Sequence, residues 1–247
     1  MLTERHDTTL NNQFIRQIAI DWNKIEKQSY LRSIPALHKL STLELTRPIT
    51  FFVGENGSGK STLLEAIAVA YGFNPEGGTR NYSFSTYDSH SNLYEAITIS
   101  KGYRPARSGY FLRAESFYNV ATKEEDYADR LHPSEHYHEK SHGESFLALA
   151  QKRLNPDGIY ILDEPEAALS PQRQLTLLME IYNCAKNGSQ FIIVSHSPIL
   201  LSIPDALILT FDDGLVHPCT YEETDSYQIT KMFIENRDQI LRRLIGE

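Results

Sequence analysis

The chain has 247 residues, of which 40% are hydrophobic and 23% are charged, and its formal net charge at pH 7 is -8. This length can bury a full core, and the composition is ordinary for a globular protein. The acidic balance argues against the overall basic surface of a protein that coats DNA. No apolar run approaches the roughly 18 residues that a membrane-spanning helix requires, so direct membrane insertion is not expected.

The N-terminal residues and the two cysteines indicate a reducing cellular compartment. Residues 1–9 carry charges and lack the apolar core and small-residue cleavage site of a secretory signal. Cys184 and Cys219 are the two cysteines of the chain and lie far apart in the sequence. A disulfide framework is therefore not expected, and a cytoplasmic location is predicted.

Two strands are expected first, over residues 30–37 and 43–53, with Arg47 and Pro48 as a break. A helix over 61–71 follows, because this stretch is rich in Leu and Ala and stops at a glycine.

Residues 73–142 are expected to form a partly helical subdomain inserted into the core. Within them, residues 92–100 fit either a short strand or a short helix, and a strand is expected over 110–112. Residues 124–139 are polar. The whole chain, residues 1–247, is then a single domain with one insertion.

The second half of the chain alternates helices with short apolar strands. Helices are expected over 144–153, 171–186 and 225–245, strands over 159–162 and 191–195, and a hairpin from 207–211 and 215–216. Strands that alternate with helices predict an α/β fold in which a mostly parallel central sheet is flanked by helices.

The most specific motif is Gly-Glu-Asn-Gly-Ser-Gly-Lys-Ser at residues 54–61, which fits G-x-x-x-x-G-K-[ST] without a mismatch. It follows an apolar run and precedes a predicted helix, as this phosphate-binding loop (P-loop) requires. Lys60 is expected to reach the β- and γ-phosphates of a nucleoside triphosphate, and Ser61 to bind Mg²⁺. The predicted nucleotide contacts are Gly54, Glu55, Asn56, Gly57, Ser58, Gly59, Lys60, Ser61 and Thr62.

Two further strand ends carry side chains suited to phosphate chemistry. Asp163 and Glu164 follow the apolar residues 159–162, so Asp163 is expected in the magnesium shell and Glu164 beside an attacking water. His196 follows the next apolar strand, from which its imidazole could contact the γ-phosphate or hold the water. Lys60, Glu164 and His196 are therefore the predicted catalytic residues.

Together these segments resemble an ATPase of the ABC class, which includes transporter motor domains and the heads of RecF, SMC and related DNA-maintenance proteins. The segments are the P-loop at 54–61, SHGES at 141–145, ILDEPEAALS at 161–170 and IVSHS at 193–197. The likeness is closest to small stand-alone bacterial ATPases of the AAA/ABC type, for which it covers nearly the whole chain. It implies the P-loop NTPase fold of the ABC type, with ATP and Mg²⁺ as ligands.

The resemblance also implies a head-to-tail homodimer that encloses two ATP molecules. Ser141 and Gly143 would then face the γ-phosphate held by the partner subunit, at the positive end of the following helix. The usual signature of the class is Leu-Ser-Gly-Gly-Gln, from which His142 and Glu144 depart.

Two roles of the class have less defined candidates. The class places a metal-sensing Gln after a strand between these motifs, and here no Gln stands there. Glu115 is the candidate for a ligand on the metal side, beside Ser61 and Asp163, or on the water side. An ordinary solvated Glu is the alternative. For the adenine contact, both Tyr30 and Arg32 are suitably placed, and Arg32 is included among the nucleotide-binding residues.

Two side-chain clusters favour ordinary structural explanations. The first contains Lys101, Arg104, Arg107, Arg113, Tyr103, Tyr110 and Phe111. Loop charges beside a strand explain it better than nucleic-acid binding, which the net charge does not indicate. The second contains His132, His136, His138 and His142, whose spacing matches no zinc pattern, so a flexible loop is favoured over a metal site.

The leading hypothesis is a magnesium-dependent ATPase that dimerises around ATP and drives an unknown partner process. A transporter motor is one alternative, although Ser170 stands where transporters commonly have Asp. A RecF-like DNA-maintenance head is another, without the long coiled coil of its larger relatives. The last is a non-catalytic ATP switch in a defence or toxin-like system that acts through a protein partner. The intact Lys60, Asp163 and Glu164 count against loss of hydrolysis but not against such a partnership.

Overall fold

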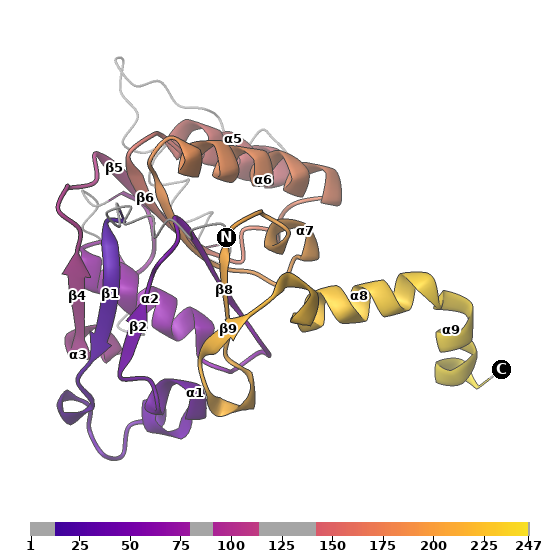
Figure 1. The fold of residues 1–247 in the computed structure, drawn as a ribbon, viewed down its shortest axis with the longest axis horizontal. Helices are drawn as coiled ribbons and strands as arrows, with labels where there is room; N and C mark the ends of the chain where they lie inside the picture. The colour runs from indigo at the N-terminus through magenta and orange to yellow at the C-terminus, as the bar shows by residue number, and fades with distance from the viewer. Residues whose placement is uncertain (1–12, 80–90, 114–141, 247) are drawn as a thin grey trace, which may run out of the picture.

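The computed structural model describes residues 13–79, 91–113 and 142–246 (Figure 1). A six-stranded sheet runs through the middle of the described part, in the order β5-β6-β7-β3-β8-β9. Its strands are β5 (Ser108–Arg113), β6 (Gly158–Asp163), β7 (Gln190–Val194), β3 (Ile49–Val53), β8 (Leu207–Thr210) and β9 (His217–Cys219). All neighbouring strands are parallel except β8 and β9. The predicted mostly parallel sheet is confirmed.

Helices cover both faces of this sheet. The helix α2 (Lys60–Tyr71) lies on one face, and α5 (His142–Arg153), α6 (Pro171–Lys186) and α7 (Pro198–Leu201) lie on the other. Side chains of β3 divide between the two layers, because successive residues of a strand point to opposite faces. Phe52 belongs to the core on the α2 side, whereas Phe51 and Val53 belong to the core beneath α5 and α6.

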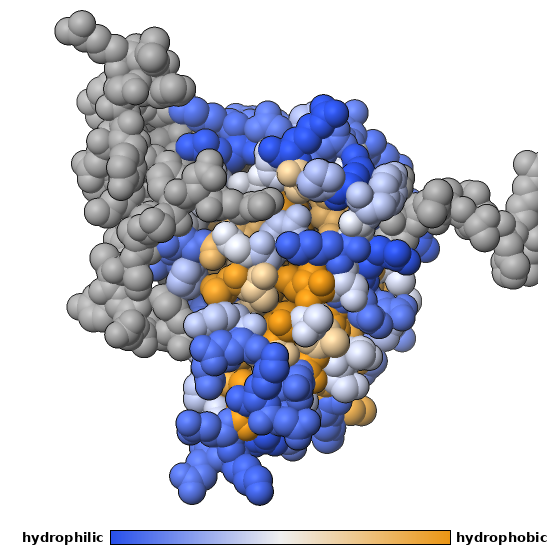
Figure 2. All heavy atoms as spheres, turned by 90° about the vertical axis from the view of Figure 1, so that its left-hand side faces the viewer, coloured by the Kyte–Doolittle hydropathy of each residue, from blue (hydrophilic) through white to orange (hydrophobic). Residues whose placement is uncertain are grey.

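A three-stranded antiparallel sheet completes the layer on the α2 side. It consists of β2 (Thr42–Glu44), β1 (Ile15–Ile20) and β4 (Ile97–Lys101), with β1 in the centre. Ile15 and Ile18 are fully buried in the same core cluster as the apolar residues of α2. Figure 2 shows the molecule from the side that carries β4. Hydrophobic residues lie in the middle of this face, with hydrophilic residues above and below them. The strand β1 was missed by the sequence analysis.

The side chain of Gln190 links the two sheets. Its Oε1 accepts a hydrogen bond from the N–H of Ile15 at 2.8 Å, and its Nε2 donates to the carbonyl of Ile15 at 2.8 Å. Gln190 is 1% exposed and Ile15 is fully buried. The amide therefore satisfies two buried backbone groups that the smaller sheet leaves unpaired at this point.

The expected strand over 30–37 is wrong. A 3-10 helix, η2 (Tyr30–Ser33), and the short helix α1 (Pro35–His38) occupy this range. The Ser29 hydroxyl accepts a hydrogen bond from the N–H of Leu31, and Pro35 stands in the first turn of α1. Capping and a proline at a helix start therefore override the apolar pattern.

Two other stretches contain more than one element. The expected strand over 43–53 is divided between β2 and β3, which belong to different sheets on either side of Pro48. Residues 92–100, which fitted either type, form the short helix α3 (Leu93–Ala96) leading directly into β4. Of the range 73–142, β4 and β5 are strands of the two sheets, while residues 80–90 and 114–141 lie outside the described part. An insertion there stays a prediction.

The expected closing helix is two helices, α8 (Asp225–Glu235) and α9 (Arg237–Ile245). Asn236 separates them because its φ of -126° leaves the helical region. Figure 1 shows the pair projecting from the body of the molecule, and neither helix has a buried residue. The predicted hairpin is confirmed, but its second strand is β9 rather than 215–216, because residues 212–214 form a 3-10 turn. In the described ranges, no helix combines the length and hydropathy needed to cross a membrane.

Replacing Gln190 with Leu tests the link between the sheets. The variant keeps an apolar stem of similar size but leaves the N–H and carbonyl of Ile15 buried without this partner. We expect the free energy of unfolding to fall by about 2–4 kcal/mol, measured by urea denaturation. The matched control is Gln172→Leu at an exposed position of α6, which should change stability by less than about 0.5 kcal/mol. Equal stability of the two variants would contradict the role of Gln190.

Candidate functional site

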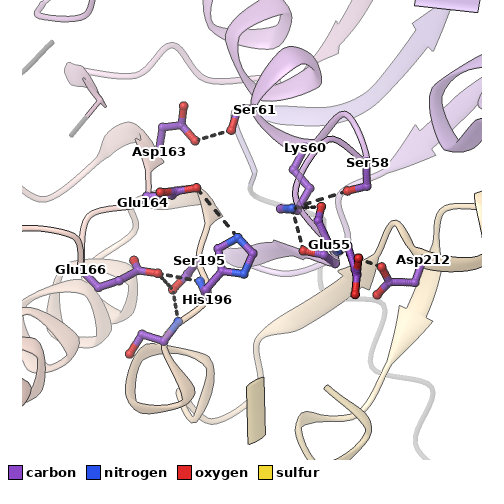
Figure 3. Close-up of polar contacts among 12 residues, drawn as sticks. Glu55, Ser58, Lys60, Ser61, Asp163, Glu164, Glu166, Ser195, His196 and Asp212 are labelled. Carbon is purple, nitrogen blue, oxygen red and sulfur yellow. Dashed lines mark hydrogen bonds and ion pairs between the residues drawn. The ribbon is translucent and has the colours of Figure 1, made fainter. Parts of the chain in front are cut away.

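Three parallel strands end at one edge of the large sheet and bring their following loops together. The P-loop follows β3, Asp163 ends β6 and Glu164 follows it, and His196 lies just after β7. In register, Phe52 pairs with Val194, and Val194 pairs with Asp163. Side chains far apart in the sequence therefore meet at this edge, as Figure 3 shows.

The P-loop is curled around the ammonium of Lys60. This side chain is 5% exposed, and its Nζ donates to the carbonyls of Gly54 at 2.7 Å and Glu55 at 2.6 Å. Burial lowers the pKa of Lys60, an effect that the nearby carboxylates, Asp212 foremost, oppose. The buried cation gives the loop a positive centre of the kind that phosphate oxygens bind.

Glycine is required at the end of this loop. Gly59 has a φ of +97°, and a Cβ there would lie 2.8 Å from the side chain of Leu37. Gly57 also has a positive φ, but a Cβ there would meet nothing within 4 Å. The loop therefore packs closely on α1 near its end and stays open in its middle, where a ligand could approach its backbone.

Ser61 and Asp163 present oxygen atoms to one another. The Ser61 hydroxyl donates to Asp163 Oδ1 at 2.9 Å, and Asp163 is 8% exposed. Hydroxyl and carboxylate oxygens are the donors that Mg²⁺ prefers, so these residues fit the predicted metal. Glu115, the third predicted ligand, lies outside the described residues.

Arg113 is a site residue whose place the sequence did not reveal. It ends β5 and pairs in register with Asp163 on β6. Its Nη1 donates to Glu65 Oε2 at 2.6 Å, and its Nε lies 3.7 Å from Asp163 Oδ2. Sequence reasoning grouped Arg113 with loop charges, since the strand pairing that brings it to Asp163 is a tertiary contact.

Glu164 and His196 face each other across the same edge. Glu164 has a φ of +50°, a left-handed conformation that is uncommon for a side-chain-bearing residue. Its N–H donates to the carbonyl of Val194 at 3.0 Å, which fixes this turn to β7. The carboxylate Oε1 lies 3.9 Å from His196 Nε2. This nitrogen is buried and has no hydrogen-bond partner among the described residues, so it is available to a ligand.

Glu166 anchors the turn that carries His196. Its Oε1 accepts hydrogen bonds from the Ser195 hydroxyl at 2.9 Å and from the N–H of His196 at 2.6 Å. Burial raises the pKa of Glu166, and these hydrogen bonds partly oppose that change. Sequence reasoning gave Glu166 no role, because its partners are 29 and 30 residues away in the chain.

Asp212 anchors the other side of the P-loop. Its Oδ1 accepts from the N–H of Glu55 at 2.9 Å, and its Oδ2 accepts from the Thr210 hydroxyl at 2.7 Å. A cavity of about 980 Å³ opens here, lined by Gly54, Asp212 and His196 together with residues of β9 and α8. The sequence analysis missed Asp212 because it stood in the predicted hairpin turn.

The remaining predicted residues lie in different places. Ser141 is outside the described residues, and Gly143 is in the first turn of α5. The Arg32 guanidinium donates to the carbonyls of Trp22, Ile25 and Glu26, so it ties the preceding 3-10 helix η1 (Trp22–Lys24) to η2. Tyr30 is 59% exposed. The adenine contact stays a prediction.

Apart from Arg113, the described residues of the two clusters set aside in the sequence do not meet at the site. Arg104 bonds to Asp157 and to the carbonyl of Gly188, while Tyr110 and Phe111 are buried in the core. His132, His136 and His138 lie outside the described ranges, and no metal-binding group of His, Cys, Asp or Glu occurs within them.

Substitution of Glu166 with Gln tests the buried carboxyl. In the unfolded chain its pKa has the ordinary value of 4.5, and in the folded protein the pKa is higher. The protonated Glu166 carboxyl therefore stabilises wild type fully below pH 4.5. This contribution to the free energy of unfolding is lost as the pH rises through the folded-state pKa. Relative to Glu166→Gln, we expect the free energy of unfolding of wild type to fall as the pH rises above 4.5 in a urea denaturation series. A pH-independent difference would contradict this assignment.

Comparison with known proteins places the chain in a family. A family model described as AAA domain matches residues 29–152, half of the chain. A second AAA-domain model matches residues 144–202, and its description adds a candidate AbiEii toxin of a type IV toxin–antitoxin system.

Curated relatives are ATP-binding proteins of importers. The ribose import ATP-binding protein RbsA of Bacillus cereus is 22% identical over 224 residues, which cover 81% of this chain and 45% of that protein. The thiamine import ATP-binding protein ThiQ of Haemophilus influenzae is 29% identical over 177 residues, which cover 64% of this chain and 80% of that protein. The chain thus spans less than half the length of the ribose-import relative.

Solved structures give weaker similarities. A metal-chelate type ABC transporter matches with a TM-score of 0.42 and 16% identity, over 73% of this chain and 75% of that one. The SMC head domain from Thermotoga maritima matches with a TM-score of 0.44 and 15% identity, over 83% of this chain and 98% of that one. Because both TM-scores are low, the assignment rests on the family models, the sequence relatives and the P-loop edge. The chain belongs to the AAA-domain family and is an ATP-binding P-loop ATPase domain of the ABC type.

Proposed function

We propose that this chain binds ATP with Mg²⁺ and hydrolyses it. One observation carries the proposal: parallel strands β3, β6 and β7 end together and bring the P-loop to Asp163, Glu164 and His196. These are the groups needed to hold phosphates, hold a metal and orient a water molecule. Relatives that are named as ATP-binding proteins support the choice of ATP.

Phosphate binding would change the groups that accept hydrogen bonds from Lys60. The Lys60 ammonium donates to two loop carbonyls, and β- and γ-phosphate oxygens would replace them as acceptors. The N-terminus of α2, which begins at Lys60, adds its unpaired N–H groups and the positive end of its dipole. Bound Mg²⁺, held by Ser61 and Asp163, would neutralise charge that develops on the phosphates.

Hydrolysis would depend on the pair formed by Glu164 and His196. Glu164 has a half-exposed carboxylate at the site edge, from which it can accept a proton from the attacking water. His196 Nε2 can donate to a γ-phosphate oxygen, which supplies the partner that this buried nitrogen otherwise lacks among the described residues. Glu166 holds the backbone of His196 in the position that this role requires.

We propose further that two copies pair head to tail around ATP. The first turn of α5 contains Gly143, so its N-terminus is suited to meet a γ-phosphate held by the partner. Glu144 in the same turn is neutralised by Arg173, whose Nη2 lies 2.8 Å from Glu144 Oε1. This ion pair limits the repulsion between that carboxylate and an incoming phosphate. Ser141 is the second proposed contact to the partner's nucleotide.

Substitution of Glu164 with Gln tests both parts of this proposal. The amide cannot accept the proton of water, so we expect phosphate release to fall at least about 100-fold while ATP binding persists. With MgATP, the mass in solution should shift from monomer to dimer and stay there. Lys60→Ala is the matched control and should lose about tenfold or more in ATP affinity. A Glu164→Gln variant that binds ATP but stays monomeric would contradict the paired-subunit mechanism, and full hydrolysis by it would contradict the role of Glu164.

The sequence relatives favour one second candidate, the motor subunit of a membrane transporter. The curated matches are import ATP-binding proteins, and such a motor would need a separate membrane subunit. We expect phosphate release by the isolated wild-type chain if it acts without that subunit. Stimulation by several-fold upon addition of membranes containing a candidate subunit would favour the transporter, whereas stimulation by DNA ends would favour a DNA-maintenance role.

A further inference from the structure

Arg113 forms a buried charge cluster with Glu65 and Asp163 on the metal side of the site. The guanidinium donates to Glu65 Oε2 at 2.6 Å and lies 3.7 Å from Asp163 Oδ2. All three side chains are largely buried, with 18%, 13% and 11% of their surfaces exposed for Arg113, Glu65 and Asp163. Charges in such a place are screened less by salt than surface charges are.

The Asp163 carboxylate is held from both of its oxygens. Ser61 donates to Oδ1, and the guanidinium of Arg113 lies beside Oδ2. Register pairing of β5 with β6 fixes the Arg113 backbone next to that of Asp163, so the guanidinium stays within reach of this carboxylate. Any divalent cation that reaches Asp163 therefore meets a positive charge nearby.

Glu65 limits how far Arg113 engages Asp163. Glu65 lies on α2, one turn after Lys60 and Ser61, and its short contact to Nη1 draws the guanidinium toward α2. The longer contact to Asp163 is the weaker of the two, because Coulomb attraction falls with distance. The carboxylates of Glu65 on α2 and Asp163 on β6 thus compete for the guanidinium of Arg113.

We propose that Arg113 is a positioning residue that sets the Mg²⁺ concentration at which this site loads ATP. Without metal it holds the Asp163 carboxylate in place, and as metal enters it opposes the added positive charge, while Glu65 restrains it. The inference rests on the proposed function, since it concerns the metal of that site. It predicts opposite effects for the two partners: removal of Arg113 eases metal entry, and removal of Glu65 impedes it by releasing Arg113 to Asp163.

The test measures binding of a fluorescent ATP analogue at increasing Mg²⁺ concentrations, a readout that needs no hydrolysis. For Arg113→Gln we expect the half-saturating Mg²⁺ concentration to fall by about tenfold, and for Glu65→Gln to rise by about threefold to tenfold. Arg113→Lys keeps the charge and should stay within about threefold of wild type. Arg104→Gln, which removes an ion pair to Asp157 at the opposite end of β5 and β6, is the matched control and should leave the midpoint unchanged.

Arg113→Gln leaves the buried carboxylates of Glu65 and Asp163 without this partner, so the fold of the variant is checked separately. The double variant Glu65→Gln with Arg113→Gln removes one of those carboxylates and should also shift the midpoint to lower Mg²⁺. Thermal unfolding in EDTA should show a lower Tm for Arg113→Gln, recovered in part by Mg²⁺ with nucleotide.

Equal or higher midpoints for both Arg113→Gln and the double variant, with wild type binding the analogue normally, would overturn this inference alone. Shifts of Arg113→Gln and Glu65→Gln in the same direction would also overturn it, because a purely structural role predicts that pattern. Failure of wild type to bind the analogue at any Mg²⁺ concentration would overturn the proposed function and the inference with it.

Discussion

The parallel alignment of β3, β6 and β7 is the constraint on which the site depends. Because these strands run in one direction and in register, the residues after each of them meet at one edge of the sheet. The P-loop lies more than 100 residues before the acidic pair and His196 in the chain, and no local interaction could bring it to them. The two cores on either side of the sheet are what hold the strand ends in this relation.

Side chains that touch no predicted ligand keep the loops at this edge in place. Asp212 fixes the start of the P-loop, Glu166 fixes the turn that carries His196, and the N–H of Glu164 is tied to β7. Each anchor is a hydrogen bond that a carboxylate or a backbone carbonyl accepts, and each is partly or wholly shielded from water. Hydrogen bonds are stronger in such surroundings, and an unpaired polar group there lowers the stability of the fold. Such anchoring lets Glu164 keep an uncommon backbone conformation. Arg113 and Glu65 extend the same arrangement to the metal side, where two carboxylates share one cation.

The sequence predicted the parallel core well because its signals there are local. An apolar run followed by a glycine-rich phosphate motif, or by two acids, defines a strand end without tertiary information. β6 and β7 lie within one residue of their expected ranges, and β3 ends at the expected residue, Val53. The stretch from 30 to 37 was assigned wrongly because a serine cap and a proline decide its structure rather than its apolar residues. The roles of Arg113, Glu166, Asp212 and Gln190 were not predictable, since each depends on which strands pair. Leu175 and Met179 recur at helical spacing in α6 yet are about half exposed, while Leu177 and Ile181 carry the buried face.

The central claim is that Ser61 and Asp163 hold a divalent cation together with the phosphates of ATP. Electron–nuclear double resonance on the protein loaded with ATP and Mn²⁺, a paramagnetic substitute for Mg²⁺, tests it most directly. The account predicts ³¹P couplings from phosphates bound to the Mn²⁺ ion, and their loss in Asp163→Asn at the same concentrations. Bound Mn²⁺ without ³¹P coupling, or an unchanged spectrum in Asp163→Asn, would contradict it.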